Sequence, residues 1–165
     1  MSTENSAIQY SVRPARALDL DQLRQVNVEC FGKSAVPLSQ VKWLLEGQGD
    51  NPSFFVRVAT ETGKPDQVLG TVVWKLKQDQ DSRYAEILDL AVGKNFRDEK
   101  VEYSLVESVV KEASERDCIG VVVNVPQANI QATAFYLHNV FQIQHTVQKY
   151  YDDGTPMDVM VRRLK

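Results

Sequence analysis

Hydrophobic residues recur along this chain with two different spacings, and the change between them predicts an alternation of strands and helices. Period-two alternation or a β-rich composition predicts strands at residues 8–13, 53–60, 68–77, 83–92, 142–151 and 157–164. Residues 118–125 (CIGVVVNV) are apolar almost without interruption. Such a run is typical of a strand that is covered on both faces and paired in parallel.

Apolar residues spaced three or four apart predict helices at residues 20–31, 39–46, 101–115 and 128–138. Asp19 stands where the first helix would take its N-cap, and Gly32 stands where that helix would end. The predicted order is therefore β-α-α-β-β-β-α-β-α-β-β. We expect the α/β fold class, with a mixed (α+β) sheet of about seven strands and about four helices. The length of the chain predicts one domain, residues 1–165, and we expect residues 1–7 to be a flexible tail.

The composition excludes several classes of function. The 165 residues carry 19 Lys and Arg against 22 Asp and Glu, a net charge of −3, so we expect no nucleic-acid binding. No apolar run reaches the roughly 18 residues of a membrane span, and the N-terminus lacks the pattern of a signal peptide. We therefore expect a cytoplasmic protein without a membrane partner. Cys30, Cys118, His138 and His145 have neither disulfide nor metal-ligand spacing, so we expect no metal.

Three stretches, in this order, carry a resemblance to a known family. Residues 86–97 read EILDLAVGKNFR, residues 129–141 read NIQATAFYLHNVF, and residues 149–160 read KYYDDGTPMDVM. Together with the element order, they resemble the GNAT superfamily of acetyl-CoA-dependent N-acetyltransferases. The third stretch is similar to the last hairpin of the enzymes that acetylate protein N-termini, the ribosomal-protein type included. The resemblance implies a GNAT-like domain that transfers acetyl from acetyl-CoA to a small amine or a protein N-terminus, as a monomer or homodimer.

The resemblance also implies where acetyl-CoA would bind. In the resembling enzymes the fourth and fifth strands separate, and the pantetheine arm lies between them. The pyrophosphate lies on backbone N–H groups at the N-terminus of the long helix. Backbone groups near Leu90 and Val92 would hold the arm and help stabilise the reacting carbonyl. The residues expected to bind acetyl-CoA are Leu90, Ala91, Val92, Arg97, Asp98, Lys100, Val101, Glu102 and Asn129.

The cofactor loop departs from the family pattern Gln/Arg-x-x-Gly-x-Gly/Ala, because residues 97–102 read RDEKVE. Arg97 matches, whereas Lys100 and Glu102 replace the two small residues that let bare backbone approach a phosphate. A unit charge about 5 Å from a phosphate, at an effective dielectric of about 20, repels it by roughly 3 kcal/mol. The alternative interpretation is an ordinary acidic helix start. The cofactor groove would then be impaired, and the protein would act as a regulatory or protein-binding subunit.

The end of the helix at residues 128–138 also departs from the family. Val140 stands where the pattern Asn-x-x-Ala-x-x-Phe-Tyr-x-x-x-Gly-Phe has its glycine. A residue in the left-handed conformation commonly ends a helix, and we expect Asn139 to supply it.

Tyr136 is the candidate general acid. In the resembling enzymes the tyrosine of the Phe-Tyr pair protonates the departing thiolate, a task that suits a phenol. The alternative interpretation is an ordinary core tyrosine. The family often places a glutamate or histidine base in the fifth strand, but Asn124 stands there, and an amide cannot accept the proton. Asn124 could orient a water, and we assign it to the substrate site.

Glu86 is the candidate base. Histone-type members place a glutamate within a Phe/Tyr-Ala-Glu-Ile sequence, and this chain reads Tyr-Ala-Glu-Ile at that place. Regular strand alternation would put Glu86 on one face with Leu88 and Leu90, where apolar neighbours would raise its pKa. The alternative is a strand-end glutamate that pairs with Arg83 or Lys75.

Four further residues are assigned to the acceptor site by the same resemblance. Tyr150 and Tyr151 resemble the tyrosines that hold the backbone of a protein N-terminus. Phe31 and Val36 resemble the opposing loop. An exposed aromatic pair also occurs in plain β-hairpins, which is the alternative interpretation of the two tyrosines.

Overall fold

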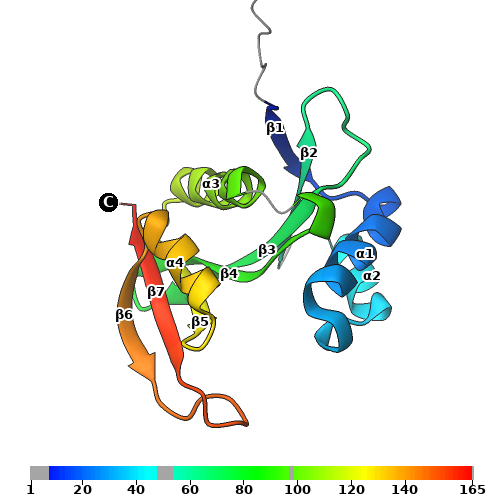
Figure 1. Ribbon diagram of the computed structural model, residues 1–165. Coiled ribbons are helices and arrows are strands. Elements are labelled where there is room, and N and C mark those ends of the chain that lie inside the picture. The colour runs from blue at the N-terminus through cyan, green and yellow to red at the C-terminus, as the bar shows by residue number, and fades with distance from the viewer. Residues whose placement is uncertain (1–7, 48–53, 97–98, 165) are drawn as a thin grey trace, which may run out of the picture.

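The computed structural model describes residues 8–47, 54–96 and 99–164, so the tail predicted at residues 1–7 lies outside the described residues. The described chain forms one seven-stranded mixed sheet with the order β1-β2-β3-β4-β5-β7-β6 (Figure 1). Neighbouring strands are antiparallel except β4 and β5, which are parallel. The strands are β1 (Tyr10–Pro14), β2 (Phe55–Glu61), β3 (Gly70–Asp79), β4 (Ser82–Val92), β5 (Gly120–Pro126), β6 (Gln142–Val147) and β7 (Met157–Arg163).

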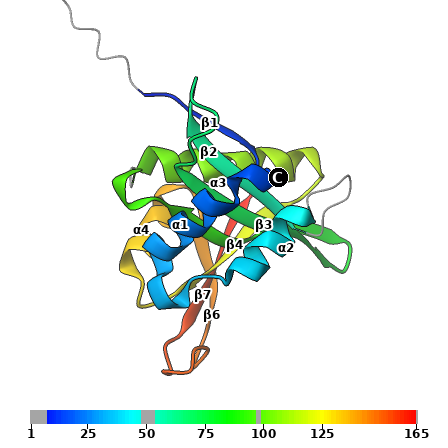
Figure 2. The ribbon, with the colours of Figure 1, turned by 90° about the vertical axis from the view of Figure 1, so that its right-hand side faces the viewer.

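Helices cover both faces of the sheet. Within the described ranges they are α1 (Leu20–Phe31), α2 (Leu38–Glu46), α3 (Glu99–Glu115) and α4 (Ile130–His138). α3 and α4 pack on one face, where Trp74 and Leu105 are fully buried. α1 and α2 pack on the other face, around Val58 (Figure 1, Figure 2). The predicted fold class and order of elements are therefore confirmed. None of these described helices is long and apolar enough to cross a membrane.

The two central strands separate toward their C-terminal ends. The parallel register of β4 and β5 ends at Ile87 and Val123. Beyond these residues β4 continues beside β3, and β5 continues beside β7. Among the described residues, no strand therefore pairs with the facing edges of β4 and β5 in this region. Backbone groups on such edges are available to a ligand.

A β-bulge in β4 begins at the same point. Val73 of β3 pairs with Asp89. The next residue of β3, Trp74, pairs with Ile87, which leaves Leu88 as an extra residue in β4. One extra residue moves every later side chain of the strand to the opposite face.

The bulge corrects the predicted orientation of Glu86. Ile87 and Leu90 both pack in the core beneath α3, although regular alternation would put them on opposite faces. Glu86 is adjacent to Ile87 in the regular part of the strand and so points to the other face. The prediction that Glu86 shares a face with Leu90 is therefore wrong.

The last hairpin is shorter than predicted. β6 ends at Val147, and Lys149 has a φ of 51°. This left-handed conformation turns the backbone out of the strand. Asp153 then accepts a hydrogen bond from the Thr155 N–H at 2.9 Å, and Gly154 has a φ of 84°. These contacts form the turn that the sequence predicts before β7.

The end of α4 corrects a second prediction. Asn139 has a φ of −98° and is not left-handed, whereas Val140 has a φ of 71°. The left-handed position therefore falls on a β-branched residue, for which this conformation is strained. Asn139 instead donates through Nδ2 to the Phe135 carbonyl at 2.8 Å.

We expect Val140→Gly to stabilise the protein by about 1 kcal/mol, because glycine adopts a positive φ without a Cβ clash. The Val140 side chain is 69% exposed, so its removal takes little apolar surface from the core. Thermal unfolding of the two proteins measures the change. Val140→Ala is the control, since alanine keeps the Cβ. An equal gain from alanine would show that the left-handed backbone is not the cause.

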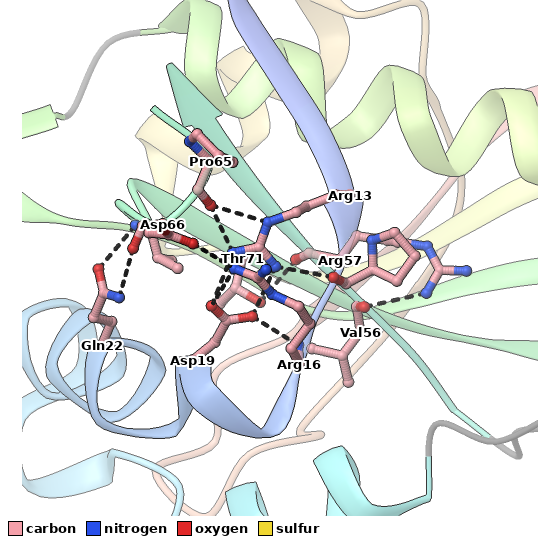
Figure 3. A network of polar contacts seen from close by, with 11 residues as sticks. Arg13, Arg16, Asp19, Gln22, Val56, Arg57, Pro65, Asp66 and Thr71 are labelled. Carbon is pink, nitrogen blue, oxygen red and sulfur yellow. Dashed lines mark hydrogen bonds and ion pairs between the residues drawn. The ribbon is translucent and has the colours of Figure 1, made fainter. Parts of the chain in front are cut away.

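Asp19 precedes α1 as predicted, but its carboxylate does not cap that helix. The carboxylate accepts two hydrogen bonds from the Arg13 guanidinium, both at 2.8 Å, and one from the Arg16 backbone N–H at 2.7 Å (Figure 3). The Arg16 side chain extends the network to Asp66 at 3.0 Å, and Arg13 also donates to the Pro65 carbonyl. This Asp19 network joins β1, the start of α1 and the β2–β3 turn.

Candidate functional site

Side chains from both helical layers meet where β4 and β5 separate. Tyr136 comes from α4, Glu102 from the first turns of α3, and Asp89 from the β4 bulge. The charges of Glu102 and Asp89 both act on the Tyr136 hydroxyl. Because such interactions weaken with distance, Glu102 and Asp89 both lie near that hydroxyl. Together with Asn27 of α1, which bonds Asp89, we call these three side chains the β4–β5 site.

Tyr136 is held as a buried phenol. It is 5% exposed and lies edge to face with the rings of Phe135 and Phe141, with centroid distances of 5.1 Å. Burial raises the pKa of its hydroxyl, and the charges of Glu102 and Asp89 raise that pKa further. The hydroxyl is therefore protonated at neutral pH, as a general acid must be. Its role as the acid stays a prediction.

Asp89 is a carboxylate for which the sequence predicts no role. The Asn27 amide donates a hydrogen bond to its Oδ2 at 3.2 Å, and the Leu90 backbone N–H also bonds it. Burial outweighs both hydrogen bonds and raises the pKa of Asp89 to about 6. A carboxylate with this pKa exchanges protons close to neutral pH, where general bases work best.

Asn27 links Asp89 to the loop between α1 and α2. Its Nδ2 donates to Asp89, and its Oδ1 accepts from the Val36 N–H at 2.7 Å. Beside the pair lies a cavity of about 30 Å³, lined by Asn27, Asp89, Thr71 and apolar side chains. This volume is large enough for one water molecule. The sequence carries one signal of this contact, because Asn27 is an amide on the apolar face of α1. A polar side chain buried on such a face is expected to have hydrogen-bond partners.

Glu86 lies just before the separation of the strands, in register with Val122 of β5. Its Oε2 is 3.8 Å from the Nζ of Lys75 on the neighbouring strand β3. This ion pair is the alternative that the sequence left open. The role of Glu86 as the base stays a prediction.

Three of the predicted acetyl-CoA ligands lie on the free edge of β4. Leu90, Ala91 and Val92 follow the last pair between β4 and β5. The Leu90 side chain packs beneath α3, and Ala91 is buried beneath α1. The Cys30 thiol donates to the Val92 carbonyl at 3.0 Å, so one acceptor of this edge is already bonded.

The start of α3 holds the next group of predicted ligands. Arg97 and Asp98 lie outside the described residues. The helix begins at Glu99, Lys100 is exposed, and Val101 is fully buried in the core. Glu102 is partly buried and acts on Tyr136. The carboxylate therefore faces the β4–β5 site, where it would oppose a nearby phosphate.

Two asparagines flank the opening on the side of β5. Asn124 is exposed and directly follows Val123, the last residue of β5 that pairs with β4. This position at the mouth of the opening suits the predicted contact with a substrate. Asn129 caps α4, and its Oδ1 accepts from the Ala132 N–H at 3.1 Å. That oxygen is therefore used in the helix cap.

The residues assigned to the acceptor site lie on two loops. Phe31 ends α1 and is 39% exposed, and Val36 follows it in the loop that Asn27 holds. Tyr150 and Tyr151 lie edge to face at a centroid distance of 4.9 Å in the β6–β7 connection. Figure 1 shows this connection extending beyond the end of the sheet. The structure thus joins Val36 to the β4–β5 site and places the tyrosines on a separate projecting loop.

The sequence matches a known protein family. The model of the acetyltransferase (GNAT) family matches residues 20–139. No curated protein matches the sequence.

Several solved structures have a similar fold, and one of them holds acetyl-CoA. NAA60 from Arabidopsis thaliana in complex with acetyl-CoA is 18% identical with a TM-score of 0.78, over 94% of this chain and 99% of that chain. The ribosomal-protein-S18-alanine N-acetyltransferase from Escherichia coli is 16% identical with a TM-score of 0.75, over 95% of each chain. Ard1 from Thermoplasma volcanium is 22% identical with a TM-score of 0.74, over 94% of this chain and 98% of that chain. At these identities the likeness is one of fold.

Proposed function

Because the chain belongs to the acetyltransferase (GNAT) family, we propose that it transfers the acetyl group of acetyl-CoA to the N-terminal amine of a protein or peptide. The observation that carries the proposal is the separation of β4 and β5 beside Tyr136. An open strand edge can bond an extended ligand as an added strand would. We further propose that residues 1–165 act as one domain in the cytoplasm, as a monomer or homodimer without a nucleic-acid or membrane partner.

The class of acceptor is proposed from fold and surface together. The Escherichia coli neighbour is named as an N-acetyltransferase of an alanine in ribosomal protein S18. In this chain, Phe31 and Tyr150 are both exposed aromatic residues. Such side chains supply large apolar contact areas for an extended peptide. A small amine is the alternative acceptor.

The Tyr136 hydroxyl and the backbone of β4 have separate roles in the proposed reaction. Bound acetyl-CoA would supply an activated thioester. The amine nitrogen forms the new C–N bond and the C–S bond breaks. We assign the proton that the sulfur takes to the Tyr136 hydroxyl. Burial keeps this hydroxyl protonated until the thiolate develops. We assign stabilisation of the carbonyl oxygen to the backbone N–H group of Val92, because the Leu90 N–H already bonds the Asp89 carboxylate.

A second candidate function rests on Glu102. Its charge acts on Tyr136, so the carboxylate faces the site at a position where the family has a small residue. Lys100 adds a further side chain at the same helix start. If repulsion of the pyrophosphate dominates, the chain is a regulatory or protein-binding subunit with the GNAT fold.

Thermal unfolding with acetyl-CoA separates these two functions. A ligand at 100 times its Kd stabilises the folded state by about 2.7 kcal/mol, which raises the Tm by several degrees. We expect a rise in the unmodified protein and a larger rise in the Lys100→Gly, Glu102→Gly variant, because phosphate then approaches the α3 N-terminus more closely. Without ligand the variant should unfold at a lower temperature, since glycine costs about 1 kcal/mol per helical position.

A matched variant and a second ligand control this experiment. Lys111 and Glu115 are exposed on the same helix, so Lys111→Gly with Glu115→Gly should lower the Tm without changing the rise caused by acetyl-CoA. Desulfo-CoA carries the phosphates but no thioester, and it should cause a similar rise. No rise in any of the three proteins would contradict acetyl transfer and favour the regulatory function.

A further inference from the structure

We propose that Asp89 is the catalytic residue that receives the proton of the attacking amine, and that Asn27 is the residue that positions it. This assignment rests on the proposed acetyl transfer. It replaces Glu86, which the sequence predicts as the base and which pairs with Lys75.

The β4 bulge gives Asp89 its place. In a regular strand, residue 89 would share the face of Ile87 beneath α3. Because Leu88 is an extra residue, Asp89 instead points toward α1, where the Asn27 amide meets it. Asp89 also lies two residues beyond Ile87, the last residue of β4 that pairs with β5. The carboxylate therefore lies beside the opening, whereas Glu86 lies before it.

Asp89 lies between the proposed acid and the acceptor loop. Toward α4, its charge acts on the Tyr136 hydroxyl. Toward the α1–α2 loop, Asn27 bonds Asp89 at 3.2 Å and the Val36 N–H at 2.7 Å. An amine that passes Val36 on its way to the thioester therefore meets Asp89. Both ends of the Asn27 amide are bonded, so the carboxylate has a fixed orientation, as a positioned base requires.

The charges around Asp89 favour a cation. The charges of Asp89 and of Glu102 on α3 both act on the Tyr136 hydroxyl of α4, and the Cys30 thiol of α1 bonds the nearby Val92 carbonyl. In the part of the chain that the structure describes, no Lys, Arg or His contributes to the pKa of Asp89. A carboxylate that no described cation neutralises attracts a substrate ammonium.

In the proposed step, the substrate ammonium loses one proton to the Asp89 carboxylate, directly or through a water in the adjacent cavity. The lone pair so released forms the C–N bond. The C–S bond then breaks, and the sulfur takes the Tyr136 proton. The second proton of the amine nitrogen returns to the Tyr136 oxygen. The proton on Asp89 leaves to solvent, so the products are the amide, the free thiol and one proton.

This base selects among amines. At pH 7 about one tenth of an α-amine with a pKa of about 8 is neutral, against less than about one thousandth of a lysine amine with a pKa of about 10.4. With a pKa of about 6, Asp89 takes a proton from an α-ammonium group far more readily than from a lysine ammonium group. We expect kcat/KM to favour a peptide α-amine over a lysine side chain by about 100-fold or more.

The pH profile of acetyl transfer to a peptide tests the assignment. We expect kcat/KM of the unmodified protein to fall below about pH 6, as Asp89 becomes protonated. Asp89→Asn should lower kcat/KM by about 100-fold and remove this fall. Asn27→Asp keeps an acceptor for the Val36 N–H but loses the donor to Asp89, so it should move the fall to higher pH. Asp81→Asn, at an exposed carboxylate of the β3–β4 turn, is the matched control.

Two measurements do not depend on transfer. Without acetyl-CoA, a peptide should bind about 10-fold more tightly than its N-formylated form, and Asp89→Asn should abolish this difference. Without any ligand, Asp89→Asn should raise the Tm at pH 8 but not at pH 4. A carboxyl whose pKa rises on folding loses stability as the pH increases from about 3.9 to its folded value of about 6.

The outcomes distinguish the two proposals. An acidic fall that persists in Asp89→Asn but disappears in Glu86→Gln would overturn the assignment and return the role of base to Glu86. Absence of transfer by the unmodified protein would overturn the proposed function. In that case the binding comparison tests the role of Asp89 independently of transfer. Equal binding of the free and formylated peptides would overturn its assignment.

Discussion

Tyr136→Phe is expected to lower kcat by about 100-fold, while the affinity for acetyl-CoA changes by less than about threefold. The hydroxyl acts when the thiolate departs, so its loss affects the transition state rather than binding. The ring contacts with Phe135 and Phe141 do not involve the hydroxyl, and we expect the fold to be kept. Steady-state kinetics with a peptide acceptor and a titration with acetyl-CoA measure the two quantities.

Tyr103→Phe is the matched control for this prediction. Tyr103 is a 51% exposed tyrosine on α3 and is not part of the β4–β5 site. We expect its substitution to leave both kcat and affinity unchanged. An unchanged kcat in Tyr136→Phe would mean that Tyr136 is an ordinary core residue, the alternative that the sequence left open.

Asp19→Ala should destabilise the fold by about 3 kcal/mol, the largest change in stability that we predict. Asp19 is 1% exposed and accepts hydrogen bonds from the Arg13 guanidinium and the Arg16 N–H. Breaking a buried ion pair costs about 3–5 kcal/mol because the remaining charge loses its partner. The Arg13 side chain is 19% exposed, which places the cost at the lower end of that range. Denaturant unfolding at neutral pH measures the change.

The same pair has a pH signature. Burial alone would raise the pKa of Asp19, but hydrogen bonds from Arg13 and the Arg16 N–H, with the charges of both arginines, lower it. A carboxyl with a lowered pKa stabilises the folded state above its unfolded pKa of about 3.9 and loses this contribution as the pH falls through the folded value. The difference between the unmodified protein and Asp19→Ala should therefore be full at pH 7 and smaller in acid.

Asp66 provides the control within the Asp19 network. Its side chain is 89% exposed and pairs with Arg16 at 3.0 Å. An exposed ion pair contributes less than about 1 kcal/mol, so Asp66→Ala should have a small effect. An equal loss in Asp66→Ala and Asp19→Ala, or a loss from Asp19→Ala that is the same at pH 3 and pH 7, would contradict this explanation.

The order of elements could be predicted from the sequence because each element has a local signal. The run at residues 118–125 contains all but the last residue of β5, which pairs in parallel with β4, and the apolar stripe at residues 101–115 contains most of α3. The ends of elements were less predictable where backbone conformation departs from residue preference. Lys149 and Val140 take positive φ values that neither side chain favours, and tertiary contacts decide such positions.

The site was predictable only in part, for a physical reason. Tyr136 and Glu102 each lie in a motif of fixed spacing, and the structure brings both to the β4–β5 site. Asp89 and Asn27 are far apart in the chain, and their contact depends on a bulge. A bulge has no strong sequence signature here, so regular alternation assigned the wrong face to Glu86. A buried amide on an apolar helix face was the one local signal of the contact.

The most direct measurement is the mass of peptides after incubation with the protein and acetyl-CoA. The panel would vary the first residue and pair each free N-terminus with its formylated form, both carrying one lysine. We expect one acetyl group to appear on at least one peptide with a free N-terminus, none to appear on the formylated form, and the product to fall about 100-fold with Tyr136→Phe. A rise in Tm with acetyl-CoA but no acetylated peptide across the panel would contradict acetyl transfer to N-terminal amines.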